Sequence, residues 1–148
     1  MSSLDELYRE VILDHYRNPR KRGRLPEPDR HAEGHNPLCG DEIALDLRLE
    51  GDRVAEVRVT GQGCSISQAS ASMMAEAIEG KTRAEIEELA HRFRMMMDIE
   101  EGDADLDDSR PGGSLGDLEA LQGVRRFPVR IKCADLAWTT LAEALESE

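Results

Sequence analysis

The sequence predicts an α+β fold in which a small antiparallel sheet of two to three strands packs against a group of helices. Apolar residues recur every three or four positions in four segments, as on helices that bury one face. In two adjacent segments they alternate with polar residues, as in strands with one buried face. A chain of 148 residues is the size of one domain, so residues 1–148 are expected to form a single unit.

The first expected helix spans about residues 4–17. Ser3 and Glu6 have the spacing of a capping box at its start, and Asn18-Pro19 interrupts the helical pattern at its end. Prolines and glycines are frequent in residues 18–38, which predicts a loop with room for one short edge strand.

The alternating segments predict an antiparallel hairpin with one solvent-exposed face. The first strand, residues 43–50, places Asp46 on the exposed face and its leucines on the buried face. Gly51-Asp52 supplies the turn, and the alternation resumes from Ala55 to Val59.

Two helices in series are expected after Gly63. Gly80 marks the end of the first, and Thr82 with Glu85 forms a capping-box spacing at the start of the second. A last helix is expected to begin near Cys133. Four methionines at helical spacing are predicted to pack in the core: Met73, Met74, Met96 and Met97.

Composition excludes several classes of protein. A net charge of -12 disfavours nucleic acid as a partner, and no apolar run reaches the ~20 residues of a membrane span, in agreement with a mean hydropathy of -0.55. Three cysteines and no signal segment predict a soluble protein of the reducing cytoplasm. Five basic side chains form a cluster interpreted as a solvated loop, or alternatively as a docking patch for an acidic protein surface: Arg17, Arg20, Lys21, Arg22 and Arg24.

An acidic loop is predicted near residues 98–113. The alternation of aspartates from Asp103 is reminiscent of a calcium loop, but the sixth position is Asp108 instead of glycine and the twelfth is Ser114 instead of glutamate. A mobile acidic loop is therefore the better interpretation.

Each cysteine lies at the edge of a predicted element, where functional sites tend to collect. Cys39 precedes the first strand of the hairpin, Cys64 lies at a strand-to-helix turn, and Cys133 lies near the start of the last helix. With Asp41 they offer the four ligands of a tetrahedral zinc site. Because the chain has no C-x2-C pair, three separate buried cysteines remain an alternative.

Neighbouring residues support a shared site. Glycines 40, 61 and 63 permit tight turns and a close approach of the backbone. A helix N-terminus favours thiolate at Cys64 and Cys133, and Lys132 is placed to offset part of the negative charge of the ligands. His15 and His91 are interpreted as surface or packing residues, and His31 and His35 as solvated loop residues within reach of the site.

At these same residues the chain resembles the SufU and IscU family of iron–sulfur cluster assembly proteins, also called NifU-like N-terminal domains. The matching strings are LYRxVIxDHYxNPR at 7–20, NPxCGD at 36–41, GxGCSIS at 61–67 and RIKCAxLAW at 130–138. The resemblance is to the SufU branch, because Lys132 stands where IscU proteins have histidine and residues 65–132 form a longer segment than in IscU proteins.

The resemblance implies a zinc ion bound by Cys39, Asp41, Cys64 and Cys133. It also implies a role as a sulfurtransferase, in which Cys39 accepts persulfide sulfur from a SufS-like cysteine desulfurase and passes it toward the downstream assembly complex. One alternative is a scaffold on which a [2Fe–2S] cluster forms on the same four ligands. Another is a non-catalytic zinc module that regulates the desulfurase.

Overall fold

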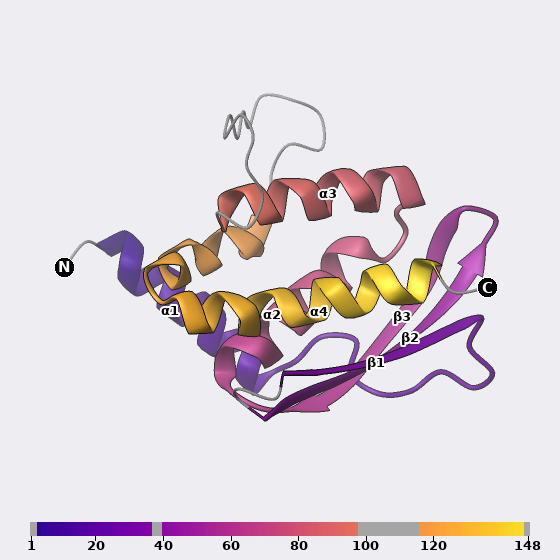
Figure 1. The fold of residues 1–148 in the computed structure, drawn as a ribbon, viewed down its shortest axis with the longest axis horizontal. Coiled ribbons are helices and arrows are strands. Elements are labelled where there is room, and N and C mark those ends of the chain that lie inside the picture. The colour runs from indigo at the N-terminus through magenta and orange to yellow at the C-terminus, as the bar shows by residue number, and fades with distance from the viewer. Residues whose placement is uncertain (1–2, 37–39, 98–115, 147–148) are drawn as a thin grey trace.

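The computed structural model describes residues 3–36, 40–97 and 116–146. A three-stranded antiparallel sheet lies on one side of the molecule and the helices lie on the other (Figure 1). The predicted α+β class is confirmed. The predicted acidic loop near 98–113 lies outside the described residues. No helix among the described ones is long and apolar enough to cross a membrane.

The sheet has the order β1-β2-β3. Strands β2 (Asp41–Glu50) and β3 (Arg53–Gln62) form the expected hairpin, and β1 (Arg30–Asn36) pairs with the outer side of β2. The third strand was expected only as a short edge strand, because its sequence RHAEGHN is mostly polar. Gly34 explains how β1 packs on helix α4 (Pro128–Glu146): a Cβ there would lie 2.2 Å from Thr140 Oγ1.

One face of the hairpin was predicted to be exposed, and at Asp46 this prediction is wrong. Only 1% of Asp46 is accessible, because residues 21–25 cross this face and pair with β3 through backbone hydrogen bonds between Lys21, Gly23 and Val59. The carboxylate accepts hydrogen bonds from Arg24 Nε (2.7 Å) and from the backbone N–H of Leu25 (3.1 Å).

His31 completes the surroundings of Asp46. Its Nδ1 lies 2.6 Å from Asp46 Oδ1, and its Nε2 lies 2.9 Å from Glu33. Burial alone would raise the pKa of Asp46, but the hydrogen bonds from His31, Arg24 and the Leu25 N–H outweigh it and lower the pKa. The hydrogen bonds to Asp46 and Glu33 raise the pKa of His31. This histidine therefore holds the sheet surface together and belongs to a strand, where the sequence suggested a loop.

Three members of the basic cluster are also used within the chain. Arg20 pairs with Asp14 at 2.6 Å, Lys21 pairs with Glu79 at 2.6 Å, and Arg24 pairs with Asp46. These ion pairs fasten the segment after the first helix to that helix, to the C-terminal cap of the second helix and to the sheet.

The helices follow the predicted order, with one addition. They are α1 (Ser3–Arg17), α2 (Ser65–Ile78), α3 (Arg83–Met96) and α4 (Pro128–Glu146), together with an unexpected 3-10 helix, η1 (Gly116–Arg126). The capping box of α3 is confirmed, since Thr82 Oγ1 accepts from the Glu85 N–H and Glu85 Oε1 accepts from the Thr82 N–H. Gly80, with φ +85°, lies just beyond the end of α2.

Helices α2 and α4 form the centre of the core. Leu45 and Leu47 of β2 are fully buried beneath them, and Phe93 of α3 stacks on Trp138 of α4 with ring centroids 5.0 Å apart. The four methionines predicted to pack in the core are all buried. His15 is also buried, with Nδ1 2.7 Å from Ser72 Oγ, so it is a packing residue.

Candidate metal centre

Asp41 is a buried carboxylate at the first position of β2. It is 0% exposed, and its Oδ1 accepts a hydrogen bond of 2.8 Å from the backbone N–H of Cys64. Among the described residues no Lys, Arg or His forms an ion pair with it. An ionised carboxylate removed from water requires a compensating positive charge. Asp41 therefore marks a place where a cation is expected.

Cys64 lies directly opposite Asp41 because of the sheet topology. Glu42 of β2 pairs with Gln62 of β3, so the residues just beyond this pair share one edge of the sheet. Cys64 is the N-cap of α2, and its Sγ accepts from the Ser67 N–H at 3.4 Å. The predicted position at a helix N-terminus is confirmed for this cysteine.

Cys133 reaches the same place from α4. The helix begins at Pro128, a residue well suited to a first helical position, so Cys133 lies in the second turn. The expectation that Cys133 is close to a helix N-terminus is therefore wrong, and the dipole argument does not apply to it. The side chain is 2% exposed, and its Sγ lies 3.8 Å from the carbonyl oxygen of Val129.

The three side chains converge. One ligand atom from each of Asp41, Cys64 and Cys133 lies within 4.8 Å of the other two. The distance from Cys64 Sγ to Asp41 Oδ2 is 3.7 Å. In a tetrahedral zinc site, bonds of about 2.3 Å to sulfur and about 2.1 Å to oxygen separate these atoms by about 3.6 Å. The donor set and its spacing fit a tetrahedral metal ion.

Glycines make this close approach feasible. Gly63 has φ +148°, and a Cβ at this position would lie 2.2 Å from Asp41 Oδ1. At Gly61 a Cβ would lie 2.3 Å from the carbonyl oxygen of Glu42. The expected close backbone contact at these two glycines is confirmed: neither position accepts a side chain without displacing the strand that carries Asp41.

Cys39, the predicted fourth ligand and sulfur acceptor, lies outside the described residues. The two residues that flank 37–39 are joined by a hydrogen bond: the Gly40 N–H donates to the carbonyl oxygen of the buried Asn36 at 2.8 Å. Lys132 is exposed, and with His35 it lines a hollow of about 210 Å³ between β1 and α4. His91 lies on α3 and is not among the three side chains that converge.

The fold and the site define a single-domain α+β protein with a buried centre of one carboxylate and two thiols. A family model described as "NifU-like N terminal domain" matches residues 7–134. The chain belongs to this family of iron–sulfur cluster assembly proteins.

Relatives cover nearly the whole chain. It is 46% identical over 147 residues to the "Zinc-dependent sulfurtransferase SufU" of Bacillus subtilis, covering 99% of this chain and 95% of the relative. It is 38% identical to the "Iron-sulfur cluster assembly scaffold protein IscU" of Streptococcus pyogenes, with coverage of 99% and 87%. A solved structure of a putative scaffold protein for the SUF system from Fervidobacterium islandicum superposes with a TM-score of 0.81 at 35% identity, covering 93% of this chain and 95% of that one.

Proposed function

We propose that this protein is a zinc-dependent sulfur acceptor that takes persulfide sulfur from a cysteine desulfurase for iron–sulfur cluster assembly. The observation that supports it most is the buried carboxylate of Asp41, which has no cationic partner among the described residues and lies beside two thiols. The relative named as a zinc-dependent sulfurtransferase, with 46% identity over nearly the full chain, supports the same assignment.

In this proposal Asp41, Cys64 and Cys133 hold the metal and Cys39 completes the set. Bound zinc keeps the thiols deprotonated near neutral pH without changing oxidation state. Asp41 is fixed by the Cys64 N–H, and Cys64 by the Ser67 N–H, so this part of the site keeps its geometry when one ligand is exchanged.

The transfer step balances without an added oxidant. The Cys39 thiolate attacks the terminal sulfur of the persulfide on the desulfurase. A new sulfur–sulfur bond forms on Cys39, the old one breaks, and the desulfurase cysteine leaves as a thiolate. The partners implied are a SufS-like desulfurase upstream and, downstream, the complex that builds the cluster, all in the cytoplasm.

The test is to incubate the zinc-loaded protein with a cysteine desulfurase and cysteine, and to locate any gain of about 32 Da, one sulfur atom, by mass spectrometry. We expect the added mass on Cys39 and faster turnover of the desulfurase. Replacement of Cys39→Ala should abolish both effects. Full stimulation by Cys39→Ala would refute the assigned acceptor, and stimulation without added mass on any cysteine would instead support a regulator.

A scaffold for a [2Fe–2S] cluster is the second candidate, because relatives that match nearly the full chain are named as scaffold proteins. The same four side chains would serve as ligands. Anaerobic purification separates the two functions. A colourless protein with one zinc per chain supports the sulfur acceptor, whereas a brown protein with iron and sulfide supports the scaffold.

A further inference from the structure

Two of the three converging side chains are fixed to each other, and the third arrives on a different helix. The Cys64 N–H donates to Asp41 Oδ1 at 2.8 Å, so the start of α2 and the start of β2 are held as one unit. Cys133 is carried by α4, and its Sγ lies 3.8 Å from the carbonyl oxygen of Val129 in the same helix. The geometry of the site therefore depends on how α4 is held against α2.

A buried hydroxyl joins these two helices beside Cys133. Ser70 of α2 is 0% exposed, and its Oγ donates a hydrogen bond of 2.6 Å to the carbonyl oxygen of Ala134, the residue that follows Cys133. Ala134 is also 0% exposed. Because a serine side chain has a single carbon, this bond requires the backbones of α2 and α4 to lie close together.

Ser70 donates outside its own helix, although neither helix needs the bond for itself. A serine or threonine within a helix can donate to the carbonyl oxygen four residues earlier, as Thr140 of α4 does to Leu136 at 2.8 Å. The Ala134 carbonyl is paired with the N–H of Trp138 by the geometry of an α-helix. The Ser70 bond therefore acts between the helices and fixes α4 relative to α2.

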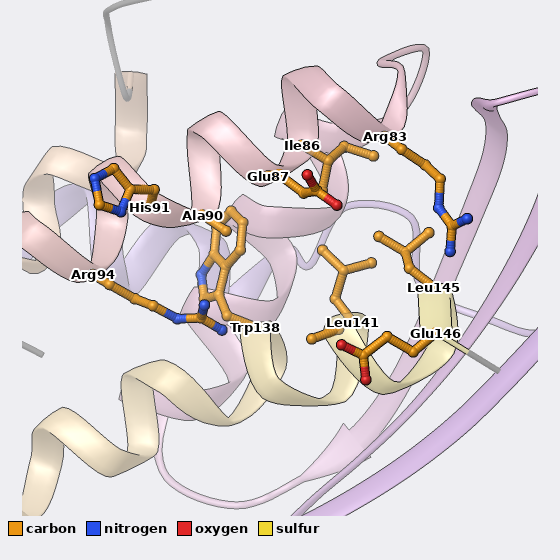
Figure 2. A pocket seen from close by; sticks show the side chains of 11 residues that line it. Arg83, Ile86, Glu87, Ala90, His91, Arg94, Trp138, Leu141, Leu145 and Glu146 are labelled. Atoms are coloured by element: carbon orange, nitrogen blue, oxygen red, sulfur yellow. The ribbon is translucent and has the colours of Figure 1, made fainter. Parts of the chain in front are cut away.

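Contacts on the α3 side restrain α4 less precisely. A groove of about 300 Å³ lies between α3 and α4, and Trp138 and Leu141 are among the side chains that line it (Figure 2). A helix face beside a gap lacks part of the contact that close packing supplies. Hydrophobic contact is also non-directional, whereas a hydrogen bond fixes the distance and direction between two atoms. The bond from Ser70 is therefore expected to provide much of the restraint on α4.

We propose that Ser70 is a positioning residue for the metal centre. Its bond to the Ala134 carbonyl fixes α4 where the Cys133 thiol lies beside the other two side chains. Bond lengths in a metal site stay within about 0.2 Å of their usual values, so a small shift of α4 is enough to weaken binding. The inference rests on the proposed zinc-binding function.

The test compares Ser70→Ala with Ser72→Ala, a matched control on the same helix. Each change removes one oxygen atom from a buried serine. Ser72 is 2% exposed, and its Oγ accepts from the Arg20 N–H at 2.8 Å and lies 2.7 Å from His15 Nδ1. Its loss therefore loosens α2 from α1 and the segment that follows α1, whereas the loss of the Ser70 hydroxyl loosens α2 from α4.

Zinc affinity is measured on the full chain by competition with a chromophoric chelator, and the absorption spectrum of the Co²⁺-loaded protein reports the arrangement of the ligands. We expect Ser70→Ala to bind zinc about tenfold more weakly than the wild type and to shift the Co²⁺ bands. Ser72→Ala should stay within about twofold of the wild type, with an unchanged spectrum. Urea unfolding of the metal-free proteins should nevertheless show that Ser72→Ala loses at least as much stability.

The two variants separate a positioning role from a general loss of stability. The proposal is overturned if Ser70→Ala binds zinc as tightly as the wild type, or if Ser72→Ala weakens binding as much. Failure of Ser70→Ala to fold would also overturn it, because the hydroxyl would then be a requirement of the fold itself. A wild-type protein that binds no zinc would refute the proposed function, whereas equal binding by the wild type and Ser70→Ala would refute this inference alone.

Discussion

Gly63→Ala should damage the metal centre selectively, since this glycine touches Asp41. The new Cβ would lie 2.2 Å from Asp41 Oδ1, and ordinary contact requires more than 3.4 Å, so the carboxylate must move by about 1 Å. This movement breaks the 2.8 Å hydrogen bond from the Cys64 N–H and shifts one ligand out of position.

Two contributions to the cost can be separated. A residue with a side chain at φ +148° is strained by about 1–3 kcal/mol in any surroundings. Gly23 provides the matched control, because its φ is +133° and a Cβ there would meet nothing within 4 Å. The contact with Asp41 adds the lost hydrogen bond, about 1 kcal/mol, and a loss of roughly 10–100-fold in metal affinity.

The assay is competition for zinc between each variant and a chromophoric chelator, with urea unfolding of the metal-free proteins in parallel. We expect Gly63→Ala to bind zinc roughly 10–100-fold more weakly than the wild type, and Gly23→Ala to remain within about threefold. Equal affinity in the two variants would show that the approach of Gly63 to Asp41 does not shape the site, and would refute this reasoning.

Three further changes test the fold. His31→Gln should destabilise the protein most below pH 6.5 and progressively less as the pH rises through the raised pKa of His31, because Asp46 and Glu33 stabilise the protonated ring. Urea unfolding at acidic and alkaline pH measures this difference in stability. A difference that does not change with pH would contradict the prediction. Gly34→Ala should lower the free energy of unfolding by about 1–3 kcal/mol, because the new Cβ would collide with Thr140. Thermal unfolding measures this, and an unchanged unfolding temperature would contradict it. Thr82→Ala should cost about 1 kcal/mol of unfolding free energy by removing the cap of α3.

Sequence periodicity predicted the hairpin and all four α-helices because each buries one regular face. It did not establish β1 as a full strand, because most residues of β1 are polar and the strand depends on Gly34 approaching α4. It also placed Asp46 in solvent, because nothing local indicates that residues 21–25 fold back across the sheet.

For the site, the meeting of Asp41 with Cys64 follows from the hairpin itself, since the start of β2 and the end of β3 share one edge. The arrival of Cys133 does not follow from local sequence. It depends on the packing of α4 against the sheet, many residues later in the chain, and on where that helix begins. Its place at the edge of a predicted element suggested it as a ligand but left three separate buried cysteines open, and the family resemblance implied the shared site. The structure places Cys133 beside the other two side chains.

X-ray absorption at the zinc edge of the purified, zinc-loaded protein tests the proposed centre most directly, because it reports the identity of the bound atoms. Ligation by Cys39, Asp41, Cys64 and Cys133 predicts three sulfur atoms at about 2.3 Å and one oxygen at about 2.0–2.2 Å. A shell of nitrogen and oxygen alone would contradict the entire site, and a shell with only two sulfur atoms would remove Cys39 from it.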